Sequence, residues 1–364
     1  MIIIYPYRNR DIERIKRSLD SLSIQKNKNF EVLFIDYGSD FEIRDFNKNI
    51  IEKNYSFVKY HYSYHLHQPW SRPRAINIGL KIAIANYKPE YVFIADIDMI
   101  FRADFVDYLH QIKCSKKSFF FKVGYLSENE TKREKVFSDY NISFTSTKEA
   151  QGLSLFPVEA LIAVGSHDEY IHFWGADNDI HNRLVHNGLK SIFIKDEIYI
   201  LHQWHIIYAN ENKQDLTKKI QLPIVSKINQ HLQWYNNFNM KTKVNGDNWG
   251  SLITEDEYNY LNNYSNPIEI GCKIEDVLHF LYVLLPREKL NAGVLHVKFN
   301  ESIIPMTLKY KIKVALRKKV FKFLSLKEIN DQLLLHLISF YKNNVYHYKI
   351  SDDLKSIELK ILFK

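Results

Sequence analysis

Two aspartates separated by one residue, Asp96 and Asp98, follow an apolar run in the stretch YVFIADIDMI at residues 91–100. The apolar run predicts a buried strand. An unpaired carboxylate is costly to bury, but the exposed carboxyl end of a strand is where open α/β sheets bind ligands. Carboxylates there supply the hard oxygen ligands that Mg²⁺ or Mn²⁺ takes together with substrate phosphates. The alternative is an acidic turn whose two acids are simply solvated.

Four further stretches carry residues suited to an anionic ligand and a metal ion. YPYRNR at residues 5–10 places two arginines after a first apolar run, and WSRPRAINIG at residues 70–79 adds an aromatic face and two more. WGADND at residues 174–179 carries carboxylates behind a glycine, and LHQWH at residues 201–205 offers imidazoles as metal ligands. Because arginine binds phosphate through a planar fork, these stretches fit one nucleotide and metal site.

The elements that must position these residues alternate between strands and helices. Periodicity predicts strands over residues 1–5, 30–36, 57–61 and 91–100, and helices over residues 11–22 and 75–85. That alternation is typical of a parallel, helix-covered α/β sheet. Further strand material is predicted over residues 155–164 and 191–204, and a helix after Gly175 that Asp177 or Asp179 could cap. Asp36 ends the second strand, so we expect it at the same sheet edge as Asp96 and Asp98.

Composition limits the class of protein without choosing the function. A chain of 364 residues with 46% hydrophobic and 25% charged residues is globular, and long enough for one large domain with additions or for two. The formal charge of +8 favours anionic partners such as nucleotides or acidic lipid surfaces. Two cysteines build neither a disulfide framework nor a cysteine metal site, which is typical of a reducing cytoplasm. No apolar stretch reaches membrane-spanning length, and the first residues lack a signal-peptide pattern.

The pattern divides the chain into a catalytic domain over residues 1–250 and a basic, mainly helical extension over residues 251–364. Residues 308–324 alternate apolar side chains with lysines and arginine, so they predict a helix that binds a membrane surface or a partner. The alternative is an added helical piece with a solvated face. Nucleic acid is not an expected partner, because the basic excess is concentrated in this extension.

In this order, the motifs resemble the metal-dependent inverting glycosyltransferases of the GT-A fold. The resemblance is to the β-1,4-galactosyltransferase family and to bacterial enzymes that build capsular and lipopolysaccharide sugars. These proteins are similar to glycosyltransferase families 2 and 7. Residues 6–10 match the family's Pro-Phe-Arg-Asn-Arg motif, residues 70–79 its Phe-Asn-Arg-Ala-Lys stretch, residues 96–98 its Asp-x-Asp motif and residues 174–179 its acceptor motif. The resemblance covers residues 1–208, and its specificity lies in the order and spacing of the motifs.

The resemblance implies a role for each matched residue. The base, ribose and phosphates of uridine diphosphate would contact Pro6, Tyr7, Arg8, Arg10, Asp36, Trp70, Arg72, Asp96 and Trp174. Asp98 would ligate the metal directly, Asp96 would touch ribose or metal, and His202 or His205 would complete the metal shell. The acid pair is one residue shorter than in the family, so the catalytic base would be Asp177 or Asp179, with Asp177 favoured because it lies closer to the glycine turn.

The implied activity is transfer of a hexose-type sugar from a UDP-sugar to an oligosaccharide or lipid-linked acceptor, with Mn²⁺ or Mg²⁺ and inversion. It would serve bacterial surface polysaccharide synthesis in the cytoplasm, at the inner face of the membrane. Two alternatives stay open. A nucleotidyltransferase of related fold would want a glycine-rich phosphate loop, which YPYRNR lacks. An inactive sugar-nucleotide-binding protein would be expected to have lost Asp98 or Asp177, and the sequence retains both.

Overall fold

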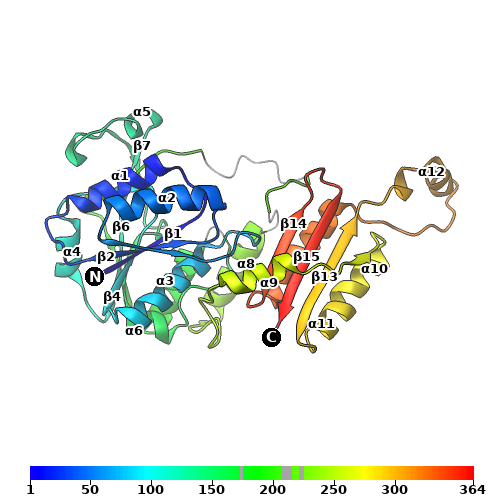
Figure 1. Cartoon of the computed structure of the whole chain (residues 1–364). Coiled ribbons are helices and arrows are strands. Elements are labelled where there is room, and N and C mark those ends of the chain that lie inside the picture. The colour runs from blue at the N-terminus through cyan, green and yellow to red at the C-terminus, as the bar shows by residue number, and fades with distance from the viewer. Residues whose placement is uncertain (173–174, 207–214, 221–224) are drawn as a thin grey trace. The chain divides into compact units, whose positions relative to one another are not determined.

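The computed structural model describes residues 1–172, 175–206, 215–220 and 225–364. The chain forms two compact units, which Figure 1 traces from the N-terminus in blue to the C-terminus in red. The first unit comprises Met1–Ser63, Trp70–Ala209 and Val225–Leu252, and the second comprises Tyr64–Pro69, Asn210–Ile224 and Ile253–Lys364.

A seven-stranded sheet in the order β10-β6-β9-β4-β1-β2-β3 organises the first unit. Its strands are β1 Ile2–Tyr7, β2 Glu31–Asp36, β3 Val58–Tyr62, β4 Tyr91–Ile94, β6 Lys117–Phe121, β9 Ser154–Pro157 and β10 Lys190–Ile194. β1 to β4 are mutually parallel, whereas β9 runs antiparallel between β4 and β6. Pro6 continues β1 instead of ending it as expected. The register with β4 stops at Ile4, so no β4 carbonyl is left to pair with residue 6.

Helices cover both faces of this sheet. The helices of the first unit are α1 Ile12–Ser23, α2 Phe41–Asn54, α3 Arg72–Asn86, α4 Phe105–Ile112, α5 Glu128–Thr131, α6 Val158–Ala163, α7 Ala176–His186 and α8 Val225–Phe238, with a 3₁₀ turn η1 at Phe137–Asp139. Among them, the short α5 lies beside β7, away from the seven-stranded sheet (Figure 1). α1 begins as predicted, because the Asp11 carboxylate accepts the Arg14 N–H at 3.0 Å. α1 and α2 lie on one face and α3 and α6 on the other (Figure 1).

The two faces of the sheet bury separate apolar layers. Ile15 and Leu19 of α1 pack with Phe34 on one face, and Ile76 of α3 packs with Ile4 on the other. Gly79 lets α3 approach β1 closely, since a Cβ at this position would lie 2.6 Å from Ile4 Cγ2. The packing fixes the start of α3 beside the carboxyl ends of the parallel strands.

A second sheet, in the order β5-β11-β7-β8, takes up the end of the stretch at residues 91–100. Its strands are β5 Met99–Phe101, β7 Val123–Leu126, β8 Ile142–Thr145 and β11 Ile200–His202. The single strand expected over residues 91–100 is therefore two strands in different sheets, with both aspartates in the segment between them. β5 pairs antiparallel with β11, and Met99 lies opposite His202. This pairing brings the Asp-x-Asp segment to the LHQWH segment.

The C-terminal unit has its own four-stranded sheet, in the order β12-β13-β15-β14. Its elements are β12 Ile268–Ile270, β13 Gly293–Asn300, β14 Val345–Ile350 and β15 Ser356–Phe363, with helices α9 Glu255–Asn263, α10 Ile274–His279, η3 Phe280–Leu284, α11 Leu285–Glu288, η4 Ile304–Met306, α12 Leu308–Ala315 and α13 Leu326–Phe340. The predicted extension over residues 251–364 therefore contains a sheet in addition to its helices. Among the described residues no helix is long and apolar enough to cross a bilayer.

Candidate active site

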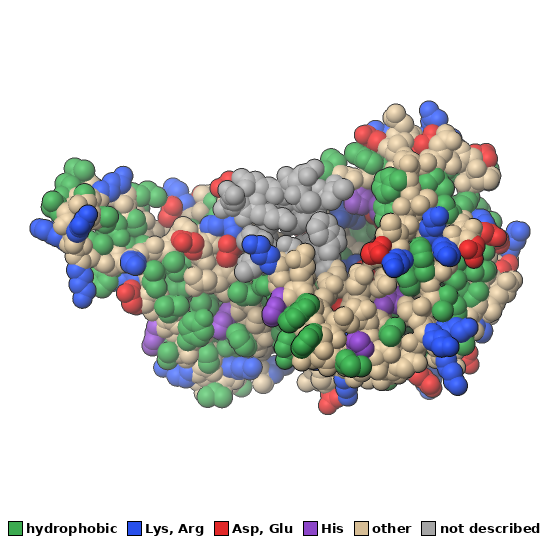
Figure 2. Space-filling model, turned by 180° about the vertical axis from the view of Figure 1, so that it is seen from behind, with side chains coloured by type: hydrophobic (Ala, Val, Ile, Leu, Met, Phe, Trp, Pro, Cys, Tyr) green, Lys and Arg blue, Asp and Glu red, His purple; other side chains and the backbone are tan. Residues whose placement is uncertain are grey.

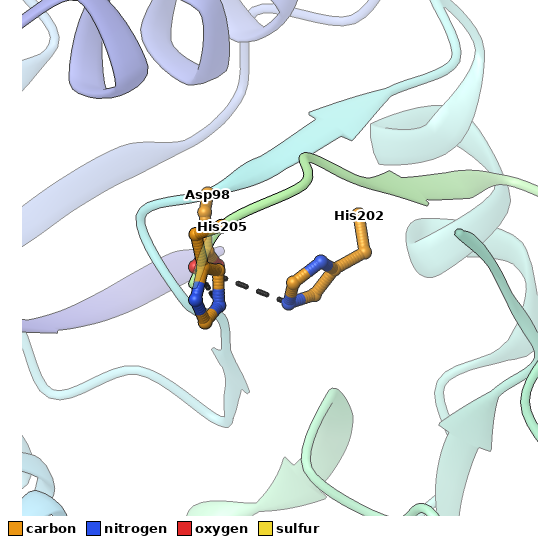
Figure 3. Close-up of side chains that lie close together, drawn as sticks. All are labelled: Asp98, His202 and His205. Atoms are coloured by element: carbon orange, nitrogen blue, oxygen red, sulfur yellow. Dashed lines mark ion pairs between the residues drawn. The ribbon is translucent and has the colours of Figure 1, made fainter. Parts of the chain in front are cut away.

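Asp98, His202 and His205 converge at the junction of the two sheets of the first unit (Figure 3). The Asp98 Oδ2 atom lies 3.4 Å from His205 Nε2 and 3.9 Å from His202 Nε2. The backbone adds to the arrangement, because Gln203 N–H donates to the Asp98 carbonyl at 2.9 Å. Within the described ranges this is the one group of three or more His, Cys, Asp or Glu side chains that could hold a metal ion.

The geometry of this trio fits a divalent cation. Two ligands that each lie about 2.1 Å from one ion are separated by about 3–4 Å, which is the spacing found here. Asp98 Oδ1 is buried and has no hydrogen-bond partner among the described residues. His205 Nδ1 lies 3.0 Å from the Ile206 carbonyl, which favours a proton on Nδ1 and leaves the Nε2 lone pair available. The trio therefore has the donor atoms and the spacing that Mn²⁺ or Mg²⁺ would need.

Arg72, the first residue of α3, joins two carboxylates from different elements. Its guanidinium donates to Asp96 Oδ1 at 2.7 Å, to Asp177 Oδ1 at 2.6 Å and to the Gly152 carbonyl at 2.9 Å. Asp96 belongs to the segment after β4, and Asp177 lies in the first turn of α7. One planar fork thus fixes the Asp-x-Asp segment and the acceptor motif relative to each other.

The charges of this group are mutually dependent. Burial opposes the charge on Arg72, but Asp177 and Asp96 outweigh it and raise the pKa of the guanidinium. Burial alone would raise the pKa of Asp177, yet Arg72 more than compensates and the pKa is lowered. For Asp96, burial and the neighbouring charge of Asp98 prevail over Arg72, so its pKa is raised. Asp177 is accordingly a carboxylate at neutral pH.

The two acids of the acceptor motif have different surroundings. The Asp177 side chain is 26% exposed, whereas that of Asp179 is 1% exposed and forms a 2.6 Å ion pair with Arg183, which is equally buried. Asp179 also accepts the Asn236 amide at 2.9 Å. The prediction that Asp177 or Asp179 caps α7 is wrong, since the N-cap residue is Gly175, at φ +96°. Asp179 therefore contributes to the packing of α7 through its buried ion pair and hydrogen bond.

Among the predicted nucleotide contacts, Asp36 lies at the end of β2 with both carboxylate oxygens hydrogen-bonded. One accepts the Ser39 N–H at 2.8 Å and the other accepts the Tyr60 hydroxyl. Burial raises the pKa of Asp36 to about 6. The partly buried Trp70 ring and the Tyr37 ring make a T-shaped contact, with 5.7 Å between their centroids.

The YPYRNR stretch divides between the core and the sheet edge. Pro6 and Tyr7 are buried in β1, and the Tyr7 hydroxyl donates to the Arg10 carbonyl at 3.1 Å. Arg8 is partly buried, which lowers its pKa, and Arg10 is exposed. Arg8, Asn9 and Arg10 are therefore the members of this stretch that extend beyond the core. Trp174 lies outside the described residues.

One participant in this arrangement was missed at the level of sequence. Gly152 accepts from Arg72, and a Cβ at this position would lie 3.3 Å from Asp177 Oδ2. Its lack of a side chain keeps space beside that oxygen. No motif or periodicity surrounds Gly152 in the polar stretch that contains it, so the sequence carried no signal for this role.

The mostly parallel sheet with helices on both faces defines an α/β class of protein, and comparison with protein families agrees with it. Residues 2–143 match the family Glycosyl transferase family 2. This part of the chain is a glycosyl transferase family 2 domain, and the predicted GT-A fold is confirmed. The matched range includes Arg72, Asp96 and Asp98 and ends before Asp177 and the two histidines. No curated protein matches the chain.

Solved structures with a similar arrangement are remote in sequence. Staphylococcus aureus TarS is 14% identical with a TM-score of 0.44, over 80% of this chain and 45% of that chain. GalNAc-T7 with UDP, GalNAc and Mn²⁺ is 14% identical with a TM-score of 0.47, over 65% and 49%. The mannosyltransferase PcManGT from Pyrobaculum calidifontis, in complex with GDP-Man and Mn²⁺, is 15% identical with a TM-score of 0.39, over 56% of each. The chain thus spans less than half the length of the TarS structure first described.

Proposed function

We propose that the chain is a metal-dependent inverting glycosyltransferase that moves a hexose-type sugar from a UDP-sugar to a saccharide acceptor. The observation that carries the proposal is the Arg72 bridge between Asp96 and Asp177, next to the trio of Asp98, His202 and His205. It combines a candidate metal site with a charged acid in a chain that contains a glycosyl transferase family 2 domain.

Asp177 is the proposed catalytic base. Arg72 occupies its Oδ1 atom, while Oδ2 lies beside the space left by Gly152. The hydroxyl oxygen of the acceptor would attack the anomeric carbon from the side opposite the leaving diphosphate, and Oδ2 would accept the proton that this hydroxyl loses. The new C–O bond forms as the bond to the phosphate oxygen breaks, and the configuration inverts. We prefer Asp177 to Asp179 because the latter is committed to Arg183 in the interior.

On the donor side, Asp98, His202 and His205 would hold Mn²⁺ or Mg²⁺. When bound, the ion would neutralise charge that develops on the departing diphosphate. Arg8 and Arg10 are proposed for the phosphates, because both extend beyond the core at the end of β1. Asp36 and Trp70 are proposed for the ribose or base, as the resemblance implies.

The role proposed for Arg72 differs from the phosphate contact that the resemblance implies. Its guanidinium already donates to three acceptors. We therefore assign Arg72 to positioning: it orients Asp177, keeps it ionised and fixes Asp96 at the start of the metal segment. Asp96 then supports the donor site through Arg72, and Asp98 is the proposed direct metal ligand.

An oligosaccharide or lipid-linked saccharide is the proposed acceptor, in synthesis of a bacterial surface polysaccharide. Cys114 and Cys272 are both free, as suits a reducing compartment. We accordingly propose that the reaction takes place in the cytoplasm, at the inner face of the membrane.

The test is release of UDP from a panel of UDP-sugars, measured with Mn²⁺ and again with EDTA. We expect slow hydrolysis of one donor without any acceptor and its loss in EDTA. Asp98→Asn should abolish the release, whereas the matched change at an exposed aspartate, Asp247→Asn, should leave it unchanged. Release that persists in EDTA would refute the metal requirement. Failure to release UDP from any UDP-sugar would refute the proposed donor class.

A further inference from the structure

The segment at residues 303–323, between β13 and α13, exposes apolar side chains to an unusual degree. It contains η4 and α12, and α12 stands apart from the sheet of the C-terminal unit (Figure 1). Leu308 is 73% exposed, Ile312 48% and Leu316 60%. Leu308 and Ile312 belong to α12 and Leu316 is its C-cap, so the spacing of i, i+4 and i+8 puts all three on one side of the helix. Further exposed apolar residues of the segment are Ile303, Ile304, Met306, Val314 and Phe321.

The same segment concentrates positive charge. Seven basic residues fall within residues 309–322, namely Lys309, Lys311, Lys313, Arg317, Lys318, Lys319 and Lys322. No aspartate or glutamate occurs over residues 302–327, so this short stretch accounts for nearly all of the net charge of +8. Figure 2 shows lysine and arginine side chains interspersed with hydrophobic ones at the end of the C-terminal unit that contains α12.

Contacts within the unit hold this segment in shape without covering its apolar side. The Tyr310 hydroxyl donates to the Phe321 carbonyl at 2.8 Å, and the Tyr310 ring meets Phe323 edge to face. Phe323 in turn forms an isolated β-bridge with Lys273, just before α10. The exposed apolar side of α12 is therefore presented on an anchored loop.

We propose that residues 303–323 bind the surface of a membrane that contains anionic lipids. Basic side chains are attracted to an anionic leaflet, and apolar side chains that reach its headgroup boundary leave water. A polyanion such as nucleic acid would satisfy the lysines but would leave Leu308, Ile312 and Leu316 in water. A surface that is both anionic and apolar below its headgroups matches both properties. This binding needs neither donor nor metal, so it is independent of the proposed glycosyl transfer.

The experiment is sedimentation of the full chain with phosphatidylcholine vesicles, with and without phosphatidylglycerol. The charge variant is Lys311→Gln with Lys313→Gln and Lys318→Gln, and the apolar variant is Leu308→Ser with Ile312→Ser and Leu316→Ser. The control carries the same loss of charge at exposed lysines of the first unit, Lys53→Gln with Lys116→Gln and Lys117→Gln. All nine side chains are exposed, and circular dichroism would verify that each variant folds.

We expect the parent to bind phosphatidylglycerol vesicles and to bind pure phosphatidylcholine much more weakly. The charge variant should bind about a hundredfold more weakly, since each lysine near an anionic surface contributes roughly a factor of five. The apolar variant should also lose binding, and the control should bind like the parent. No binding by the parent, equal binding to neutral vesicles, or equal losses in the charge variant and its control would each overturn the proposal. So would unaltered binding by the apolar variant, which would indicate a site for any polyanion.

Discussion

Exchanging Asp177 and Asp179 for asparagine, one at a time, should separate catalysis from stability. Asp177→Asn removes the proposed base. Because general-base catalysis contributes about 10²–10⁴-fold, kcat should fall by that factor. The side chain is 26% exposed and Arg72 keeps Asp96 as a partner, so the fold should be little affected. Donor binding should also persist, because Asp177 belongs to the acceptor side of the proposed site.

Asp179→Asn should behave in the opposite way. Asp179 and Arg183 are each 1% exposed, and Arg183 also donates to the Val164 and Ser166 carbonyls at 2.9 and 2.7 Å. The guanidinium therefore cannot turn to solvent when its carboxylate is lost. Removing one partner of a buried ion pair costs about 3–5 kcal/mol. For a unit of this size that lowers Tm by about 10 °C.

The assays are UDP release in the presence of an acceptor, at a temperature where both variants are folded, and thermal unfolding by differential scanning fluorimetry. Glu13→Gln is the matched control, since it breaks an exposed ion pair with Lys16. It should change the free energy of unfolding by less than about 1 kcal/mol. A folded, thermally unchanged Asp179→Asn protein without transfer, together with an active Asp177→Asn protein, would refute the assignment of the base.

Three further outcomes follow from the geometry of the site. His202→Ala and His205→Ala should each weaken Mn²⁺ binding by at least about tenfold in isothermal titration, and an unchanged affinity would remove that histidine from the metal shell. Gly152→Ala should slow transfer and spare UDP binding, because its methyl group would crowd Asp177 Oδ2; equal turnover would show that the space beside this oxygen is not used. Burial raises the pKa of Asp36 to about 6, so the folded state binds this proton more tightly than the unfolded state, and the contribution of Asp36 to stability falls as pH rises from about 4 to about 6. Asp36→Asn should remove that dependence. The Tm of the variant minus that of the parent should therefore increase as pH rises from about 4 to about 6 and stay constant at higher pH. A difference that is constant over the whole range would contradict the raised pKa.

The first unit was largely predictable because its strands and helices follow local rules. Asp11 caps α1, and the strands that precede Asp36 and Asp96 are continuous apolar runs. α2 was missed because only Asn47 and Ile51 are buried in a helix of mostly polar residues, which leaves a weak apolar period. In the C-terminal unit, by contrast, β15 alternates buried and less buried residues throughout, a period of two that predicts a strand and was overlooked.

Within the site, residue types were predictable and their partners were not. The Asp-x-Asp spacing made Asp98 a candidate ligand, but its approach to His202 depends on antiparallel pairing between β5 and β11, which are about a hundred residues apart in sequence. The choice between Asp177 and Asp179 depends on how α7 packs, since the helix turns Asp179 inward to Arg183 and leaves Asp177 partly exposed. Long-range packing of this kind leaves no mark in a local pattern.

The hydrogen bond from Gln203 to the Asp98 carbonyl has a consequence for metal selectivity. Together with the pairing of Met99 and His202, it fixes the backbones that carry two of the three candidate ligands. An assembled ligand set needs little conformational rearrangement to receive an ion, so the entropy lost on binding is small. A rigid frame also tolerates few changes in radius. We therefore expect the preference between Mn²⁺ and Mg²⁺ to depend on the two imidazoles, which suit manganese better, and not on an adjustment of the cavity to each ion.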